Sequence, residues 1–227
     1  MLRLAAAALL MCAPAPLALA SADMSARPGE TIKFDVYRGR NTSFGAHEVR
    51  FSENDDGELI AEVSIRLRAG IGPVTVFRYE HDSTERWDNG RLVAFEGRTL
   101  KDGDTFRVEG RANGEGFDVT GRDPGGDDVS KTFPSDILPS SHWVRYPPGT
   151  ESVLNTEHGT LMEVEVEFLG EEEIEADGGK IPARRYRLTS SLTLDLWYDE
   201  NGRWARTEFE ARGQRVTYVR RANPADA

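Results

Sequence analysis

The stretch LTLDLWYDENGRW, Leu192 to Trp204, carries the pattern that decides the fold. Its side chains alternate between two faces: one face has Leu192, Leu194, Leu196 and Tyr198, and the other has Thr193, Asp195 and Trp197. Such alternation is typical of a β-strand with one apolar face and one polar face, which would place Trp197 at the surface. Asn201-Gly202 favours a tight turn. The stretch therefore predicts a strand–turn–strand hairpin, in which Trp197 and Trp204 meet across the pair.

The same alternation recurs along most of the chain. EVSIRLR, Glu62 to Arg68, and MEVEVEF, Met162 to Phe168, each place apolar residues at every second position. Gly-containing turn sequences separate such runs, among them NDDG ending at Gly57 and ADGG ending at Gly179. The sequence thus predicts an all-β fold, a single curved antiparallel sheet or incomplete β-barrel of roughly a dozen strands.

One segment departs from this pattern: PSDILPSSHWVRYPPG, Pro134 to Gly149. Its four prolines prevent it from forming another strand, and Ile137, Leu138 and Trp143 give it apolar contacts. A large antiparallel sheet must cover its apolar face with something. We therefore expect an irregular or short helical segment that covers the open side of the sheet, with Trp143 as its anchor.

The N-terminus predicts export. Residues 1–22 have a basic start at Arg3, an apolar run and small residues at the end, which is typical of a secretory signal peptide cleaved after Ala20 or Ala22. An alternative is a lipoprotein with Cys12 as the lipidated residue. We expect one β domain over residues 23–221, a disordered tail over 222–227, no membrane-spanning segment, and a periplasmic or secreted location.

Composition and motifs exclude several classes of function. The formal net charge of −11 argues against nucleic acid as a partner. The chain has no G-x-S-x-G, Walker or H-E-x-x-H motif, so no cofactor is expected. Its four histidines are His47, His81, His142 and His158, and none lies three or four residues from another. No metal site is therefore expected.

Two stretches supply candidate ligand-binding residues. In FRYEHDSTERW, Phe77 to Trp87, one face of the strand carries Phe77, Tyr79, His81, Ser83 and Glu85, which mixes polar groups into an apolar face. This pattern suits polar anchors inside an apolar cavity, although a strand that runs from core to rim would explain it as well. The predicted ligand-binding residues are Tyr79, His81, Leu138, His142, Trp143 and Asn155.

Several motifs together resemble a known family. They are IPARRYRL from Ile181, LDLWYDENGRW from Leu194, FEARG from Phe209, FRYEHDSTERW, DILPSSHW, and LNTEHG from Leu154. From about Ile32 to Arg221 the chain resembles a domain-of-unknown-function family of exported Gram-negative bacterial proteins with a DLWYD-x-x-G hairpin. That family looks distantly like the periplasmic half-barrels that carry lipoproteins. The resemblance implies a fold, but it implies no catalytic residue.

These observations favour an exported soluble protein of the cell envelope that binds or carries a hydrophobic, lipid-like ligand without catalysis. Two alternatives stay open. One is a hydrolase at the mouth of the sheet, which would use His142 or His158 with a serine or a carboxylate. The other is a structural partner of another envelope protein.

Overall fold

The computed structural model describes residues 24–71 and 74–222, and every regular element in these residues is a β-strand. The predicted signal peptide and all of the predicted tail except its first residue, Ala222, lie outside the described residues. Because none of the described segments forms a helix, no membrane-spanning helix occurs among them. The strands are β1 Thr31–Arg38, β2 Thr42–Glu53, β3 Leu59–Ile71, β4 Val74–Asp88, β5 Arg91–Lys101, β6 Asp104–Ala112, β7 Phe117–Arg122, β8 Asp128–Phe133, β9 Ser152–Leu154, β10 Leu161–Glu163, β11 Glu165–Ala176, β12 Gly179–Thr189, β13 Leu194–Asp199, β14 Trp204–Ala211 and β15 Gln214–Arg220.

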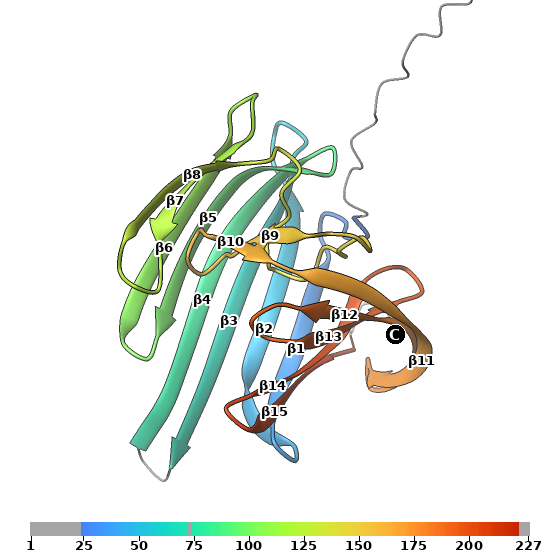
Figure 1. Cartoon of the computed structure of the whole chain (residues 1–227). Coiled ribbons are helices and arrows are strands. Elements are labelled where there is room, and N and C mark those ends of the chain that lie inside the picture. Colours follow the sequence, from blue (N-terminus) through green and yellow to red (C-terminus); the bar gives the residue numbers. More distant parts are fainter. Residues whose placement is uncertain (1–23, 72–73, 223–227) are drawn as a thin grey trace, which may run out of the picture.

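Thirteen of these strands form one antiparallel sheet in the order β11-β12-β13-β14-β15-β1-β2-β3-β4-β5-β6-β7-β8. The pairing of β1 with β15 joins the C-terminal strands to the N-terminal ones. Strands β11 and β8 are the two free edges, so the sheet curves without closing into a barrel (Figure 1). The prediction of an all-β, curved antiparallel sheet is confirmed.

The period-two pattern has the expected structural result. Along β3 the side chains of Ala61, Val63 and Leu67 are buried on the concave side, whereas Glu62 and Arg66 are exposed. Each strand of this kind contributes every second side chain to a single apolar cluster that spans both halves of the sheet.

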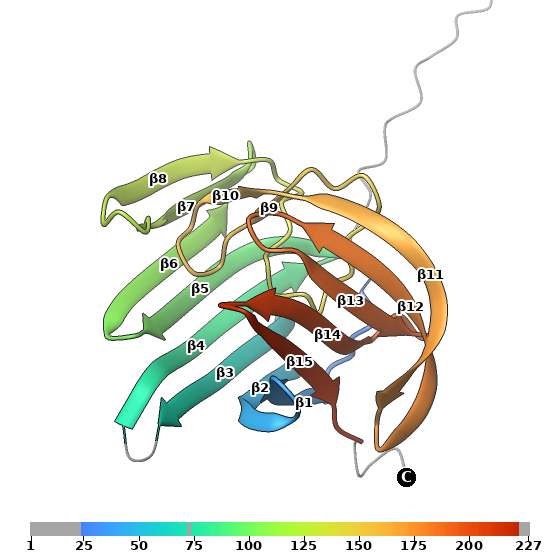
Figure 2. The same ribbon diagram turned by 60° about the horizontal axis from the view of Figure 1, so that its bottom comes forward.

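The two tryptophans of the β13–β14 hairpin do not meet, which corrects the prediction from the sequence. A register shift after Trp197 places Tyr198 opposite Trp204 and Trp197 opposite Arg206. Trp204 therefore lies in the main core, while Trp197 packs on the other side with Ile174. Trp197 is only 5% exposed, because the β11–β12 hairpin bends around the outside of its neighbours (Figure 2).

Residues 134–149, which we call the plug, contain no helix, so the irregular form of the covering segment is present and the short helix is not. The Trp143 ring packs at 4.9 Å from Phe51 of β2 and 5.3 Å from Trp87 of β4. On the opposite wall, Tyr198 of β13 donates a hydrogen bond to the carbonyl of His142 at 2.9 Å. The plug thus contacts both walls of the curved sheet.

The β9–β10 hairpin follows the plug, and we call residues 152–163 the strap. Figure 1 shows this pair lying across the inner side of the sheet. Ser140 N donates to Leu154 O at 2.9 Å and Leu154 N donates to Leu138 O at 2.8 Å, so backbone hydrogen bonds connect plug and strap. A Cβ at Gly121 of β7 would lie 2.5 Å from His158 O, which shows how closely the strap approaches the sheet.

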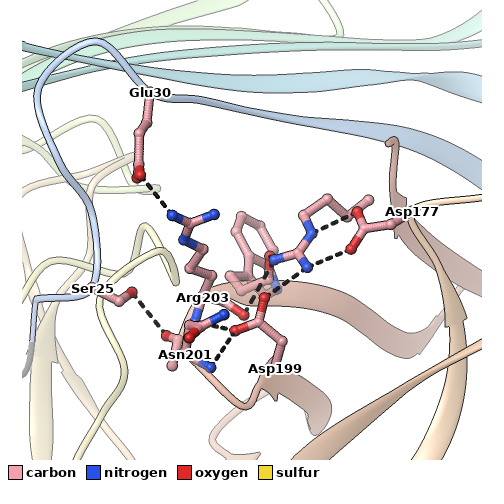
Figure 3. Close-up of polar contacts among 9 residues, drawn as sticks. Ser25, Glu30, Asp177, Asp199, Asn201 and Arg203 are labelled. Carbon is pink, nitrogen blue, oxygen red and sulfur yellow. Dashed lines mark hydrogen bonds and ion pairs between the residues drawn. The ribbon is translucent and has the colours of Figure 1, made fainter. Parts of the chain in front are cut away.

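A partly buried charge cluster fixes the turn of the β13–β14 hairpin (Figure 3). Arg220 Nη2 lies 2.6 Å from Asp177 Oδ2 and 2.7 Å from Asp199 Oδ2. The other oxygen of Asp199 accepts the backbone N–H groups of Asn201 and Arg203, each at 2.9 Å. Asp199 therefore links the tip of the hairpin to β15, and Gly202 supplies the positive φ of +75° that the turn needs.

We predict that Trp143→Ala lowers the free energy of unfolding by about 3 kcal/mol, because the ring is 2% exposed and its removal leaves a cavity in the core. Urea denaturation measures this value. Phe168→Ala, at a side chain 48% exposed, is the control and should shift the midpoint far less. Equal midpoints for the two variants would contradict Trp143 as the anchor of the plug.

We also predict that Arg220→Met destabilises the fold by about 3 kcal/mol, since it leaves the carboxylate of Asp199 buried and without its cation. Arg221→Met is a control next to it, because Arg221 pairs with Asp35 at the surface and such pairs contribute about 1 kcal/mol or less. Thermal and urea unfolding of both variants provide the comparison. If both variants lose the same free energy of unfolding, the Arg220 cluster contributes no more to stability than the surface pair of Arg221 and Asp35.

Candidate functional site

The six residues predicted to bind a ligand fall into three places. Tyr79 and His81 lie on β4, with their rings stacked at a centroid distance of 6.5 Å. Leu138, His142 and Trp143 belong to the plug, and Asn155 lies in the turn of the strap. Of the six, Leu138 alone lines one of the two hollows described below, so neither hollow brings the six together.

His81 is buried and neutral. Its Nδ1 lies 2.8 Å from the hydroxyl of Thr99 on β5. Burial lowers the pKa of His81 to about 4, so the ring carries no charge at neutral pH. In this arrangement His81 is a polar contact between two strands.

Asn155 shapes the strap. Its side-chain oxygen accepts the backbone N–H groups of Glu157 at 2.9 Å and His158 at 3.1 Å, which is the usual role of Asn in a turn. The turn places Glu157 Oε1 2.8 Å from Lys101 Nζ and 3.0 Å from His158 Nε2. These contacts attach the strap to β5.

His142 is also committed to internal contacts. It has a positive φ of 65°, and its Nδ1 lies 3.0 Å from the hydroxyl of Tyr146. Burial lowers the pKa of His142 to about 4. In the described part of the chain, no histidine forms a hydrogen bond with a serine, and the hydroxyl of Ser140 instead bonds with Thr156 at 3.0 Å.

Glu85 is a functional candidate that the sequence did not single out. Its side chain has no exposed surface, and its Oε2 accepts the indole N–H of Trp87 at 3.1 Å and that of Trp143 at 2.9 Å. Burial raises the pKa of Glu85 to about 7, although the Ser141 hydroxyl and both indoles lower it in part. The Ser141 contact falls short of a hydrogen bond, so Glu85 Oε1 and Ser141 Oγ have no partner among the described residues.

His47 is the second buried group that sequence reasoning missed. It lies on β2 among aromatic rings, with Trp204 at 5.1 Å, and neither ring nitrogen has a hydrogen-bond partner among the described residues. Burial, followed by the nearby His81 and His142, lowers the pKa of His47 to about 3. The alternation along β2 could have indicated that His47 is buried, because His47 lies on the same face of the strand as Val49 and Phe51.

The described residues form at least two hollows at the surface. The larger one, about 450 Å³, lies on the polar outer face of β2 to β6 and is lined by charged side chains such as Glu62 and Arg98. The smaller one, about 310 Å³, lies where both ends of the plug meet the β4–β5 turn, and we call it the plug pocket. Leu92, Ile137 and Leu138 contribute to its wall. The plug pocket suits a hydrophobic group better, because these apolar side chains form part of its wall, beside the charged Arg91, Asp136 and Glu151.

The residues described here contain no cluster of three or more His, Cys, Asp or Glu side chains that could bind a metal ion.

We predict that His47→Phe makes the protein less sensitive to acid. The pKa of His47 is lower in the folded chain than in the unfolded chain, so its contribution to stability is present above pH 6.5 and is lost as the pH falls towards 3. Between pH 7.5 and pH 5.0 the wild type should lose about 2 kcal/mol more of its unfolding free energy than the variant. Urea unfolding at both pH values measures the difference, and parallel losses would contradict a buried, neutral His47.

Comparison with solved structures places the fold among barrel-like proteins. The chain is similar to a structure from Brucella abortus, described as the crystal structure of a beta-barrel-like protein of the domain of unknown function DUF1849. The TM-score is 0.59 at 9% sequence identity, and the match covers 84% of this chain and 94% of that chain. At this identity the likeness concerns the fold alone.

Comparison with protein families gives a more direct result. No curated protein matches the chain. Residues 34–221 match the model of a family described as a domain of unknown function, DUF6134, which confirms the kind of family that the sequence motifs resembled. The match covers most of the 227 residues, and the chain therefore belongs to the DUF6134 family.

Proposed function

We propose that this chain is an exported, non-catalytic binding protein of the cell envelope, and that it holds the hydrophobic part of a small, lipid-like molecule in the plug pocket. The observation that carries the proposal is the pocket itself. Its volume of about 310 Å³ is at the lower end of the usual range for ligand pockets, about 300 to 1,000 Å³. Such a space suits one chain or ring of a ligand.

The plug leaves the plug pocket as the proposed binding site, because plug and strap side chains fill the concave face of the sheet. Trp143, Val144 and Leu154 are at most 2% exposed and belong to the same apolar cluster as the sheet. The part of the concave face beneath them is therefore packed with the chain's own side chains. A ligand that filled the whole half-barrel would first have to displace the plug.

The lining of the plug pocket supports a ligand with an apolar body and a polar end. Leu92, Ile137 and Leu138 supply apolar contacts, while Arg91 adds a positive charge and Asp136 and Glu151 add negative ones. Mixed charges at a pocket favour a polar group that both donates and accepts hydrogen bonds. The N-terminal sequence supports the cellular location, because an envelope protein meets such molecules after export.

The contacts of the candidate catalytic groups support binding over hydrolysis. His158 uses both ring nitrogens internally, Nε2 with Glu157 and Nδ1 with the carbonyl of Arg122. His142 bonds with Tyr146. A hydrolase needs a nucleophile within hydrogen-bond reach of its base, and neither histidine has a serine there. His158 does have a carboxylate beside it, that of Glu157, but the same oxygen accepts a hydrogen bond from Lys101 at 2.8 Å.

We predict that Leu138→Trp weakens ligand binding at least about tenfold, because the larger ring occupies the plug pocket. Native mass spectrometry after incubation with an envelope-lipid extract measures retention, and each retained molecule is then identified by solvent extraction. Leu161→Trp is the matched control: Leu161 is 45% exposed and does not line the pocket. Equal retention by both variants would move the binding site elsewhere, and no retained molecule with the wild type would refute the proposal.

A further inference from the structure

One carboxyl group, that of Glu85, connects the plug to strand β4. Glu85 comes from β4, and its Oε2 accepts one indole N–H from the same strand, that of Trp87, and one from the plug, that of Trp143. The two residues that bond across this boundary are 58 positions apart in the sequence. Glu85 therefore connects the plug to the middle of the sheet at a point that water does not reach.

Among the described residues, no cation contributes to the pKa of Glu85, which is set by burial and by the hydroxyl and indole donors. The residues opposite it are Ala61 on β3 and Phe95 on β5. The plug contributes Ser141 and Tyr146, whose phenol is kept neutral because burial raises its pKa. Other titratable groups of this core are the histidines His81 on β4, His47 on β2 and His142 in the plug. The phenols of Tyr79, Tyr198 and Tyr218 also belong to it, and burial raises the pKa of each, so they are neutral.

Those three histidines are neutral at physiological pH, since burial lowers the pKa of each one. An ionised Glu85 would thus be a single buried charge with only neutral donors beside it. Burying a charge without a counter-ion is costly, whereas the neutral acid can still accept both indole hydrogen bonds on Oε2. The neutral acid also has a proton for the unpartnered pair, Glu85 Oε1 and Ser141 Oγ.

We propose that Glu85 is a proton-controlled latch on the plug: the neutral acid keeps the plug closed on the sheet, and loss of its proton makes the plug open more often. The inference does not depend on a ligand in the plug pocket. Burial raises the pKa of Glu85 to about 7, so we expect the latch to lose its proton near neutral pH. Because this pKa is raised in the folded state, the stabilisation is complete below the unfolded value of 4.5 and is lost as the pH rises through 7.

Hydrogen exchange of the plug tests the latch. Amide exchange of residues 137–146 is measured at pH 6.0 and pH 8.5, and each rate is corrected for intrinsic exchange at that pH. The variant Glu85→Gln keeps an acceptor for the indoles but cannot ionise. Glu96→Gln is the matched control, because Glu96 lies on the neighbouring strand and is exposed.

The comparison of the wild type with the two variants isolates the effect of Glu85 on plug opening, because the histidines are present in all three proteins. From pH 6.0 to pH 8.5 the plug-opening constant of the wild type should rise about tenfold more than that of Glu85→Gln. Glu96→Gln should behave as the wild type. An equal pH response of the wild type and Glu85→Gln would overturn the latch.

A second measurement decides the matter if Glu85→Gln does not fold. A protonated carboxylic acid has an infrared carbonyl band that a carboxylate lacks. At pH 6.0 exposed acids are ionised, so the wild type should show this band and lose it by pH 8.5. Its absence at pH 6.0 would mean that Glu85 is already ionised, and the proposal would fail.

Discussion

The structure depends on the contact between the Trp143 indole and the concave face of an open sheet. An antiparallel sheet that curves without closing exposes one apolar face, and the hydrophobic effect requires that face to be covered. Here one irregular segment covers it, with Trp143 between Phe51 and Trp87 on one wall and His142 bonded to Tyr198 on the other. The plug thus gives a half-barrel the continuous core that a closed barrel or a sandwich obtains from a second layer of strands.

This constraint explains which parts of the fold were predictable from the sequence. Alternation in β3 and β13 reflects local geometry, because successive side chains of a strand point to opposite faces, and it correctly indicated an all-β sheet. The prolines of the plug likewise excluded a strand. The relation between Trp197 and Trp204 was wrong, because one register shift moved them to opposite sides of the sheet. A shift of that kind depends on the strands on either side, and the hairpin sequence alone does not contain it.

The candidate site was less predictable, for a physical reason. The sequence placed Tyr79, His81 and Glu85 on one face of β4, and the structure has His81 and Glu85 buried there with Tyr79 partly so. What makes Glu85 unusual is the residue that covers it, Trp143, which lies 58 positions away. Desolvation is a property of packed neighbours, so a raised pKa follows from the fold and not from a local motif. Asn155 is the opposite case. Its side chain bonds with backbone groups two and three residues further along the chain, so its role in the turn depends on local sequence alone.

The buried titratable groups act on the same core in opposite directions. His47, His81 and His142 must be neutral in the folded chain, so each opposes folding as the pH falls below 6.5. Glu85 must be neutral as well, but it is an acid and opposes folding as the pH rises through 7. Charge of either sign is therefore unfavourable in this core, and the two kinds of group respond to pH in opposite directions. The plug that completes the fold also makes its stability sensitive to protons, because Glu85 and His142 are buried where the plug meets the sheet.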